Sequence, residues 1–305
     1  MLSLAAAPPL DNTPAQAYSP MPAPIRQAGS PRHKRPRLKT IEPGRITRVR
    51  LLSNREQVYY LYVPHTIRQP GALFVSVHGI SRNAKEHARR FAAYAEQQGI
   101  VMLCPRFARD QGYGRHFQRL RSDPSGTSAA EVLNQIIDET DQRLAICTER
   151  LYLFGFSGGG QFVHRYLMAY PERVASAVIG AAGWYTFPDQ GVRYPRGLKP
   201  NPNYRHRARF PDYLSIPILV VVGEWDHQRD EALNSSPRID RQQGRDRIER
   251  GRRWIEAMQS AAAEAGMDTT YQLQLLPASG HSFSDAMTQG QAGASIWGFL
   301  FGELR

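Results

Sequence analysis

The sequence predicts an α/β fold, with a mostly parallel central sheet and helices on both of its faces. Short apolar runs alternate with longer amphipathic stretches along most of the 305 residues. Such alternation is typical of βαβ units, whose parallel strands are buried on both faces. With 41% hydrophobic and 22% charged residues, the chain can also bury a large core, which excludes disorder throughout.

The first predicted elements are three strands. Residues 46–53 and 57–63 are rich in Val, Leu and Tyr, and the polar residues between them favour a hairpin. Residues 72–77 form a continuous apolar run, as expected for a strand that is covered on both sides. The predicted sheet therefore begins with an antiparallel pair and becomes parallel afterwards.

The following elements alternate between helix and strand. Apolar residues at helical spacing predict a helix over 85–97, and Gly99 is placed to end it before a strand at 100–104. Ser128 and Glu131 form a capping-box pattern that predicts the start of the next helix. The remaining predictions are strands at 151–156, 174–179, 218–222 and 271–276, and helices at 161–169, 247–265 and 292–301.

Residues 1–45 are predicted to form a disordered, basic arm. Nine prolines lie between Ala5 and Pro43, and no apolar periodicity accompanies them. The net charge is +12, and the first 50 residues hold nine basic and two acidic side chains, so the folded part is only mildly basic. Such an arm could touch phosphates, but we expect a solvated tail and no nucleic-acid partner.

The compartment follows from what the chain lacks. It has no convincing signal peptide and no apolar run of transmembrane length, so we expect a cytoplasmic protein. Cys104 and Cys147 fall at opposite ends of predicted strands, too far apart for a disulfide. No metal-ligand spacing occurs, and we expect neither a metal nor another cofactor.

The segment Gly155-Phe156-Ser157-Gly158-Gly159 reads G-x-S-x-G, the pattern of a nucleophile elbow. Alone the pattern is weak evidence for a nucleophile, because a serine without a catalytic role in a glycine-rich turn would match it as well. Here it follows a predicted strand and opens a predicted helix, which is the setting that an elbow requires. Ser157 is therefore the candidate nucleophile.

A serine nucleophile needs a base and an acid that orients it. His281 follows the strand at 271–276 and is the preferred base, and Asp226 follows the strand at 218–222 and is the preferred acid. The alternative residues are His164, His206 and His227 as bases and Glu224 and Asp230 as acids. The oxyanion hole would use the N–H of Gly158 and, by analogy, that of Ile80, which follows His78 and Gly79.

These residues carry a resemblance to a known family. The chain order Ser157, Asp226, His281, the pair His78-Gly79 and the strand–helix order resemble the α/β-hydrolase superfamily over residues 46–305. Within it, the chain looks most similar to the esterases of the polyhydroxyalkanoate-depolymerase-like and dienelactone-hydrolase-like branch. The long, charged stretch 227–251 departs from the pattern and puts the choice of Asp226 in doubt.

The connection 184–215 resembles a lid in its position and combines aromatic with basic side chains. It could bind an aromatic or anionic ester, or it could pack its aromatic side chains on the sheet edge and leave its arginines in water. Trp184 and Tyr185 are the predicted pocket residues, and His78 either contacts substrate or braces its loop.

The function predicted from the sequence is hydrolysis of a carboxylic ester, of small or polymeric substrate, through an acyl-enzyme. An acyltransferase, thioesterase or peptidase could use the same groups, because a fold does not select a substrate. A non-catalytic binding protein on the same scaffold is the alternative outside the enzyme class.

Overall fold

The computed structural model describes residues 41–69, 71–109, 113, 116–122, 126–144, 146, 148–204 and 208–302. Residues 1–40 of the predicted arm, Cys147 and His206 lie outside the described residues, and what the sequence predicts for them stays a prediction. In the described part of the chain, no helix is long and apolar enough to cross a bilayer.

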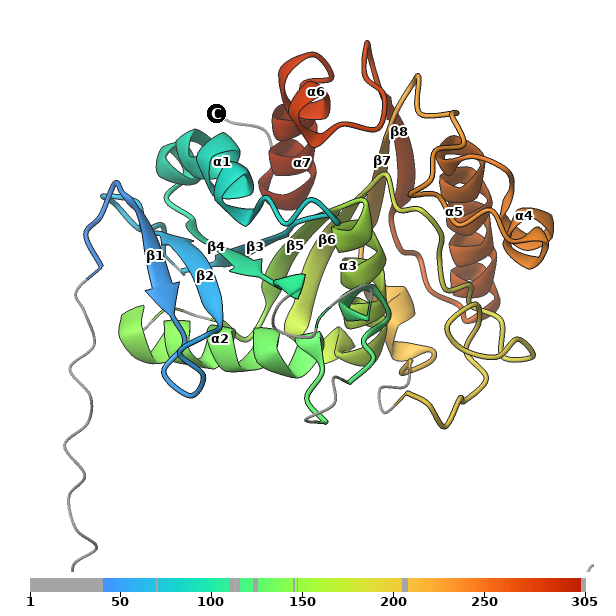
Figure 1. Cartoon of the computed structure of the whole chain (residues 1–305), viewed down its shortest axis with the longest axis horizontal. Helices are drawn as coiled ribbons and strands as arrows, with labels where there is room; N and C mark the ends of the chain where they lie inside the picture. The colour runs from blue at the N-terminus through green and yellow to red at the C-terminus, as the bar shows by residue number, and fades with distance from the viewer. Residues whose placement is uncertain are drawn as a thin grey trace, which may run out of the picture. The chain divides into compact units, whose positions relative to one another are not determined.

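An eight-stranded sheet, with the order β1-β2-β4-β3-β5-β6-β7-β8, forms the centre of the described structure (Figure 1). Strands β1 and β2 are antiparallel to their neighbours, and the other six strands run parallel. Their bounds are β1 (Ile46–Arg50), β2 (Val58–Tyr62), β3 (Leu73–Val77), β4 (Val101–Arg106), β5 (Leu151–Phe156), β6 (Val174–Gly180), β7 (Ile218–Gly223) and β8 (Tyr271–Leu276). The carboxyl ends of the parallel strands therefore share one edge of the sheet.

Helices cover both faces of the sheet (Figure 1). Helices α1 (Ala84–Gln98) and α7 (Ala292–Phe301) pack on one face. The other face carries α2 (Ala129–Leu144), α3 (Gly158–Ala169) and α5 (Arg247–Glu264). The shorter elements are the helices α4 (Pro237–Gln243) and α6 (Phe283–Thr288) and the 3-10 turns η2 (Phe117–Arg119), η3 (Pro171–Arg173) and η4 (Asp212–Ser215).

The helix ends form for the reasons that the sequence indicates. Gly99 ends α1 in the left-handed conformation, with φ of 67°, where a side chain would be strained. At the start of α2, the Ser128 N–H donates to the Glu131 carboxylate at 2.6 Å, and the Glu131 N–H donates to the Ser128 hydroxyl at 3.2 Å. This reciprocal pair confirms the predicted capping box.

The α/β class and the predicted run of strands and helices are confirmed. The differences are local. Helix α3 begins at Gly158, three residues before the predicted start, because the turn after β5 leads directly into it. The pattern of the sequence does not distinguish α4 or α6 from a loop, because each is too short to show a helical apolar pattern.

Candidate active site

Ser157 occupies the sharp turn between β5 and α3. Its φ is +54° and its ψ is −111°, a conformation that a residue with a side chain rarely adopts. The Ser157 N–H donates to the Gly180 carbonyl of the neighbouring strand β6 at 2.7 Å, which holds the strained residue in place. The turn therefore presents the hydroxyl at the carboxyl-end edge of the sheet.

Two glycines allow this turn to lie close to its neighbours. A Cβ atom on Gly155 would lie 2.2 Å from the Gly159 carbonyl oxygen, and one on Gly159 would lie 2.0 Å from the Val77 carbonyl oxygen. Both contacts are with backbone, which cannot move away as a flexible side chain would. Close backbone packing between α3, β5 and β3 therefore requires glycine at the first and last positions of the G-x-S-x-G motif.

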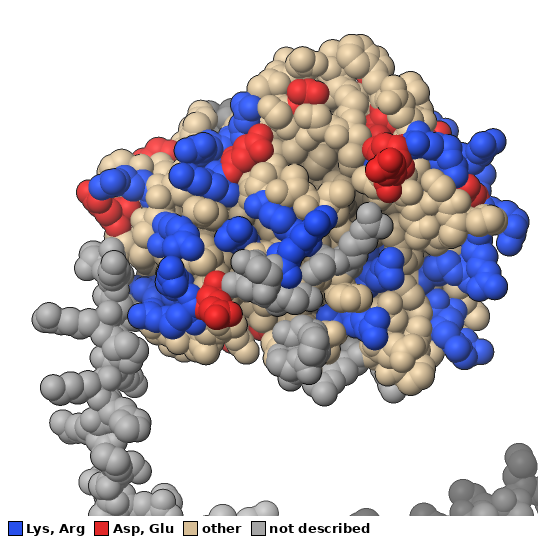
Figure 2. All heavy atoms as spheres, viewed as in Figure 1, with Lys and Arg blue, Asp and Glu red and all other residues tan. Residues whose placement is uncertain are grey.

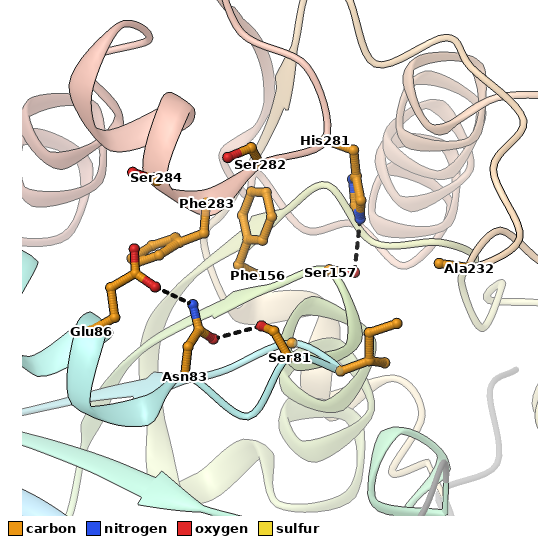
Figure 3. A pocket seen from close by; sticks show the side chains of 12 residues that line it. Ser81, Asn83, Glu86, Phe156, Ser157, Ala232, His281, Ser282, Phe283 and Ser284 are labelled. Carbon is orange, nitrogen blue, oxygen red and sulfur yellow. Dashed lines mark hydrogen bonds between the residues drawn. The ribbon is translucent and has the colours of Figure 1, made fainter.

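A hydrogen-bonded chain joins Ser157, His281 and Asp226. His281 Nε2 lies 3.0 Å from Ser157 Oγ, and His281 Nδ1 lies 2.7 Å from Asp226 Oδ2. Figure 3 shows the imidazole pointing at the serine from the opposite side of the pocket. Ser157 follows β5, Asp226 follows β7 and His281 follows β8, so the shared carboxyl-end edge of the parallel strands brings the three side chains together.

The alternative residues that the sequence left open lie elsewhere. Asp230 is ion-paired with Arg247, while a Glu224 carboxylate oxygen accepts the Ala278 N–H at 2.7 Å and so holds the turn that precedes His281. His164 is buried in α3, with its ring nitrogens near the Gly160 carbonyl and the Thr186 N–H. His227 is exposed, and His206 is outside the described residues.

Arg247, the first residue of α5, holds the far side of Asp226. Its Nη1 donates to Asp226 Oδ1 at 3.0 Å, and its Nη2 donates to both oxygens of Asp230 at 2.9 and 3.0 Å. The Arg247 and Asp226 side chains are each 1% exposed, whereas Asp230 is 40% exposed. Burial by itself raises the pKa of Asp230, but the Arg247 guanidinium outweighs it and lowers that pKa.

His78 braces the loop after β3. The Phe107 N–H donates to His78 Nε2 at 2.9 Å, so the ring proton is on Nδ1, which donates to the Gly79 carbonyl at 2.7 Å. Complete burial lowers the pKa of His78 to about 4, which keeps the ring neutral. Because the Gly79 carbonyl and the Ile80 N–H belong to one planar peptide, His78 also orients that N–H.

Two cavities meet at Ser157, and both are lined by Ile80, Ser157 and Ala232. The His281 cavity, of about 310 Å³, also includes Gly79, Phe156, His281, Phe283 and Ser284 (Figure 3). The Arg119 cavity, of about 340 Å³, also includes Gln118, Arg119, Gln161, Trp184, Asn234 and Arg247. The first therefore contains the imidazole, and the second is predominantly polar.

Of the three residues expected to contact substrate, Trp184, Tyr185 and His78, one lines a cavity beside Ser157 and two do not. Trp184 lines the Arg119 cavity. Tyr185 does not line either cavity, because its ring is fully buried and stacks on Trp254 of α5, with centroids 4.8 Å apart. His78 is also fully buried, which fits the loop-bracing interpretation.

The connection 184–215 does not cover the two cavities in the described part of the chain. Of its described residues, Trp184 alone appears in their linings. Tyr194 is buried and donates its hydroxyl proton to the Arg119 carbonyl at 2.9 Å, and Tyr213 is buried. Tyr194 and Tyr213 thus pack on the domain, as in the second of the two interpretations, whereas Phe210 is 38% exposed.

Comparisons with known proteins agree with the fold. Among solved structures, a poly(3-hydroxybutyrate) depolymerase from Bordetella parapertussis superposes with a TM-score of 0.70, at 23% identity over 86% of this chain and 92% of that one. The chain has the α/β-hydrolase fold. A poly(aspartic acid) hydrolase from Sphingomonas sp. KT-1 gives a TM-score of 0.67 at 23% identity, over 79% of this chain and 92% of that one.

A more distant α/β hydrolase is the S-formylglutathione hydrolase from Agrobacterium tumefaciens, with a TM-score of 0.52 at 14% identity, over 80% of this chain and 90% of that one. No family model matches the chain. A curated bifunctional acetylxylan esterase/xylanase from Neocallimastix patriciarum is 28% identical over 119 residues. That segment spans 38% of this chain and 16% of that protein.

The sequence analysis missed the residues that complete this α/β-hydrolase site. Arg247 lies in the charged stretch 227–251, where nothing in the sequence distinguishes it from its charged neighbours. Arg119 and Gln118 belong to η2, which does not directly follow a strand and matches no sequence motif. Arg250 is also buried, and it donates to the carbonyl oxygens of Gly183 and Asn234, which belong to two walls of the Arg119 cavity.

Proposed function

We propose that the chain hydrolyses carboxylic esters through an acyl-enzyme formed on Ser157. The observation that carries the proposal is the unbroken hydrogen-bonded chain from Ser157 Oγ through His281 to Asp226, at 3.0 and 2.7 Å. This arrangement supplies a nucleophile, a base and a group that fixes the tautomer of the base. The esterases among the structural and curated relatives support the ester as the substrate class.

In the acylation step, Ser157 Oγ attacks the ester carbonyl carbon, and its proton passes to His281 Nε2. The Asp226 carboxylate stabilises the resulting imidazolium through Nδ1, at 2.7 Å. The C–O bond to the alcohol then breaks, and His281 returns the proton to the leaving oxygen. In deacylation, His281 takes a proton from water, which attacks the acyl-enzyme and releases the carboxylic acid.

The N–H groups of Ile80 and Gly158 would bind the developing oxyanion. The Gly158 N–H is the first of α3, where backbone donors have no partner within the helix and the helix dipole favours negative charge. Ile80 lines both cavities beside Ser157, and its peptide is fixed by His78. Preorganised donors of this kind contribute about 3–4 kcal/mol each to the transition state.

The proposal is tested with 4-nitrophenyl esters of increasing acyl length and with a fluorophosphonate probe. The wild-type chain should cleave at least one ester and bind the probe covalently. Ser157→Ala should lower kcat by a factor of about 1000 or more, because the nucleophile is lost, and should abolish labelling. Ser260, an exposed residue of α5, provides the matched control, and Ser260→Ala should behave as wild type.

Full activity or full labelling in Ser157→Ala would show that the nucleophile is another residue. A wild-type chain that neither cleaves any ester nor reacts with the probe would instead indicate a binding protein on the hydrolase scaffold.

A further inference from the structure

The two cavities that meet at Ser157 can be assigned to the two halves of an ester, an assignment that rests on the proposed function. The leaving oxygen must receive its proton from His281, so the alcohol part lies on the side of the imidazole, in the His281 cavity. The oxyanion donors Ile80 and Gly158 line the Arg119 cavity, which does not contain His281. The acyl part of the ester is therefore directed into the Arg119 cavity.

Arg119 brings a positive charge to this cavity that no carboxylate of the described residues compensates. Its side chain forms no ion pair and no hydrogen bond with the described residues, and its Nε is buried without a partner there. The guanidinium carbon lies 5.6 Å from the centre of the Trp184 ring, which holds the side chain over the cavity wall. A ligand in the cavity would therefore bind the guanidinium through its two Nη atoms, which form a planar pair of donors.

Two other arginines lie near Arg119, and they differ in whether a carboxylate of the described residues compensates their charge. Arg247 is compensated by two carboxylates, Asp226 and Asp230. Arg165 lies behind Trp184, 4.4 Å from its ring centre, and donates to carbonyl and hydroxyl oxygens instead of a carboxylate. Two arginines without a carboxylate partner among the described residues thus contact the same indole ring.

The amide side chains of the cavity also require a polar occupant. Gln118, Gln161 and Asn234 line it, and the Gln161 Oε1 atom is buried without a hydrogen-bond partner among the described residues. A hydrocarbon chain in this cavity would offer no hydrogen-bond partner to the polar side chains that line it. By contrast, a carboxylate with its hydration water satisfies both donors and acceptors.

Surface charge alone would not identify this residue. Figure 2 shows basic side chains spread across the visible face, from the side of β1 and β2 to that of α4 and α5. The described arginines of the connection 184–215, which the sequence made the candidates for binding an anion, do not line either cavity. Its position at the acyl side of Ser157, and the absence of a carboxylate partner among the residues that the structure describes, distinguish Arg119 from the others.

We propose that the acyl group of the substrate carries a free carboxylate, which Arg119 binds in the cavity beside Ser157. The substrate class is then the monoester of a dicarboxylic acid, or an ester of another acid that bears a second, ionised carboxyl group. The guanidinium offers a planar pair of donors to this group, and the adjoining Gln161 amide accepts from its water or from a neighbouring hydroxyl.

The test compares charged and neutral acyl groups of equal size. Monomethyl esters of succinic, glutaric and adipic acid are each paired with the methyl ester in which a branched carbon with two methyl groups replaces the carboxylate. Acid release is followed in a pH-stat, and the ratio of kcat/KM for the charged ester to that for its neutral partner is determined. The wild-type ratio should exceed one by about tenfold for at least one chain length and should fall as salt is added.

Arg119→Gln should lower this ratio by about tenfold, to near one, because the charge-assisted contact that favours the charged ester is lost. Arg119→Lys should retain part of it, because the charge remains and the planar pair of donors is lost. Arg252 is exposed on α5 and lines neither cavity, so Arg252→Gln, which removes the same charge, should leave the ratio unchanged.

A wild-type ratio at or below one for all three chain lengths would overturn the inference, as would an equal ratio in wild type and Arg119→Gln. If the neutral esters are cleaved and the fluorophosphonate probe binds, such a result leaves the proposed function standing. Cleavage of no ester together with no labelling would remove both.

Discussion

Three fully buried histidines should make this fold unstable in mild acid. Burial lowers the pKa of His78 to about 4 and holds the pKa of His87 and of His164 well below the ordinary value of 6.5. Below pH 6.5 the unfolded chain takes up these protons, and the folded chain does not. Stability is therefore fully present above that pH and is lost as the pH falls toward the folded-state pKa values.

The size of the effect follows from the number of protons. Each proton bound only by the unfolded state lowers the free energy of unfolding by about 1.4 kcal/mol per pH unit once it is fully bound. Three such protons give a limiting slope of about 4 kcal/mol per pH unit, and a total loss of about 5 kcal/mol between pH 6.5 and 5. A domain with about 5–15 kcal/mol of stability at neutral pH would lose much of it.

Urea unfolding monitored by tryptophan fluorescence and circular dichroism, in steps of half a pH unit between pH 7 and 5, measures this slope. His87 is the histidine to replace, because it lines neither cavity and its ring is hydrogen-bonded to the Ser76 hydroxyl, at 2.8 Å. His87→Gln should reduce the limiting slope to about 2.7 kcal/mol per pH unit, since two protons remain. The surface variant His65→Gln should keep the wild-type slope.

A wild-type slope of about 1.4 kcal/mol per pH unit or less would refute this reasoning, because one proton or none would then be involved. The same slope in wild type and His87→Gln would show that the protons bind elsewhere.

Two further predictions concern side chains and backbone at the site. Arg247→Ala should lower kcat, and it should lower the free energy of unfolding by about 3–5 kcal/mol, because it leaves the Asp226 carboxylate buried without its cation. Steady-state kinetics and urea unfolding measure the two effects, and a variant with wild-type stability would contradict the prediction. Gly159→Ala should lower the free energy of unfolding by about 3 kcal/mol or more, because the new methyl group clashes with the Val77 carbonyl. Gly298 of α7 has open space around it, so Gly298→Ala should raise the free energy of unfolding by up to about 1 kcal/mol in the same assay.

The parts of the site that the sequence could predict are those attached to strand ends. Ser157, Asp226 and His281 each follow a buried apolar run, and parallel strands must end at a common edge, so their meeting follows from the pattern. Their order along the chain and the G-x-S-x-G spacing then assign each a chemical role. The structure places these three within hydrogen-bond distance, as that argument requires.

The remaining parts depend on directions and partners that a linear pattern does not contain. Trp184 and Tyr185 are adjacent and similar in character, yet one faces a cavity and the other the core. Arg247 forms ion pairs with two carboxylates, those of Asp226 and Asp230. Arg119 has no carboxylate partner among the described residues. Which charge is compensated becomes visible only when the contacts are known.

The buried Arg250 has a consequence for changing this protein's specificity. Its guanidinium holds the Gly183 carbonyl on one wall of the Arg119 cavity and the Asn234 carbonyl on the other, so both walls depend on one side chain. Shortening the loop around Asn234 would release both anchors together and collapse the cavity instead of enlarging it. A library that aims at bulkier acyl groups should therefore keep the loop length and vary the small and apolar positions Ala232 and Leu233, which line the cavity without holding it.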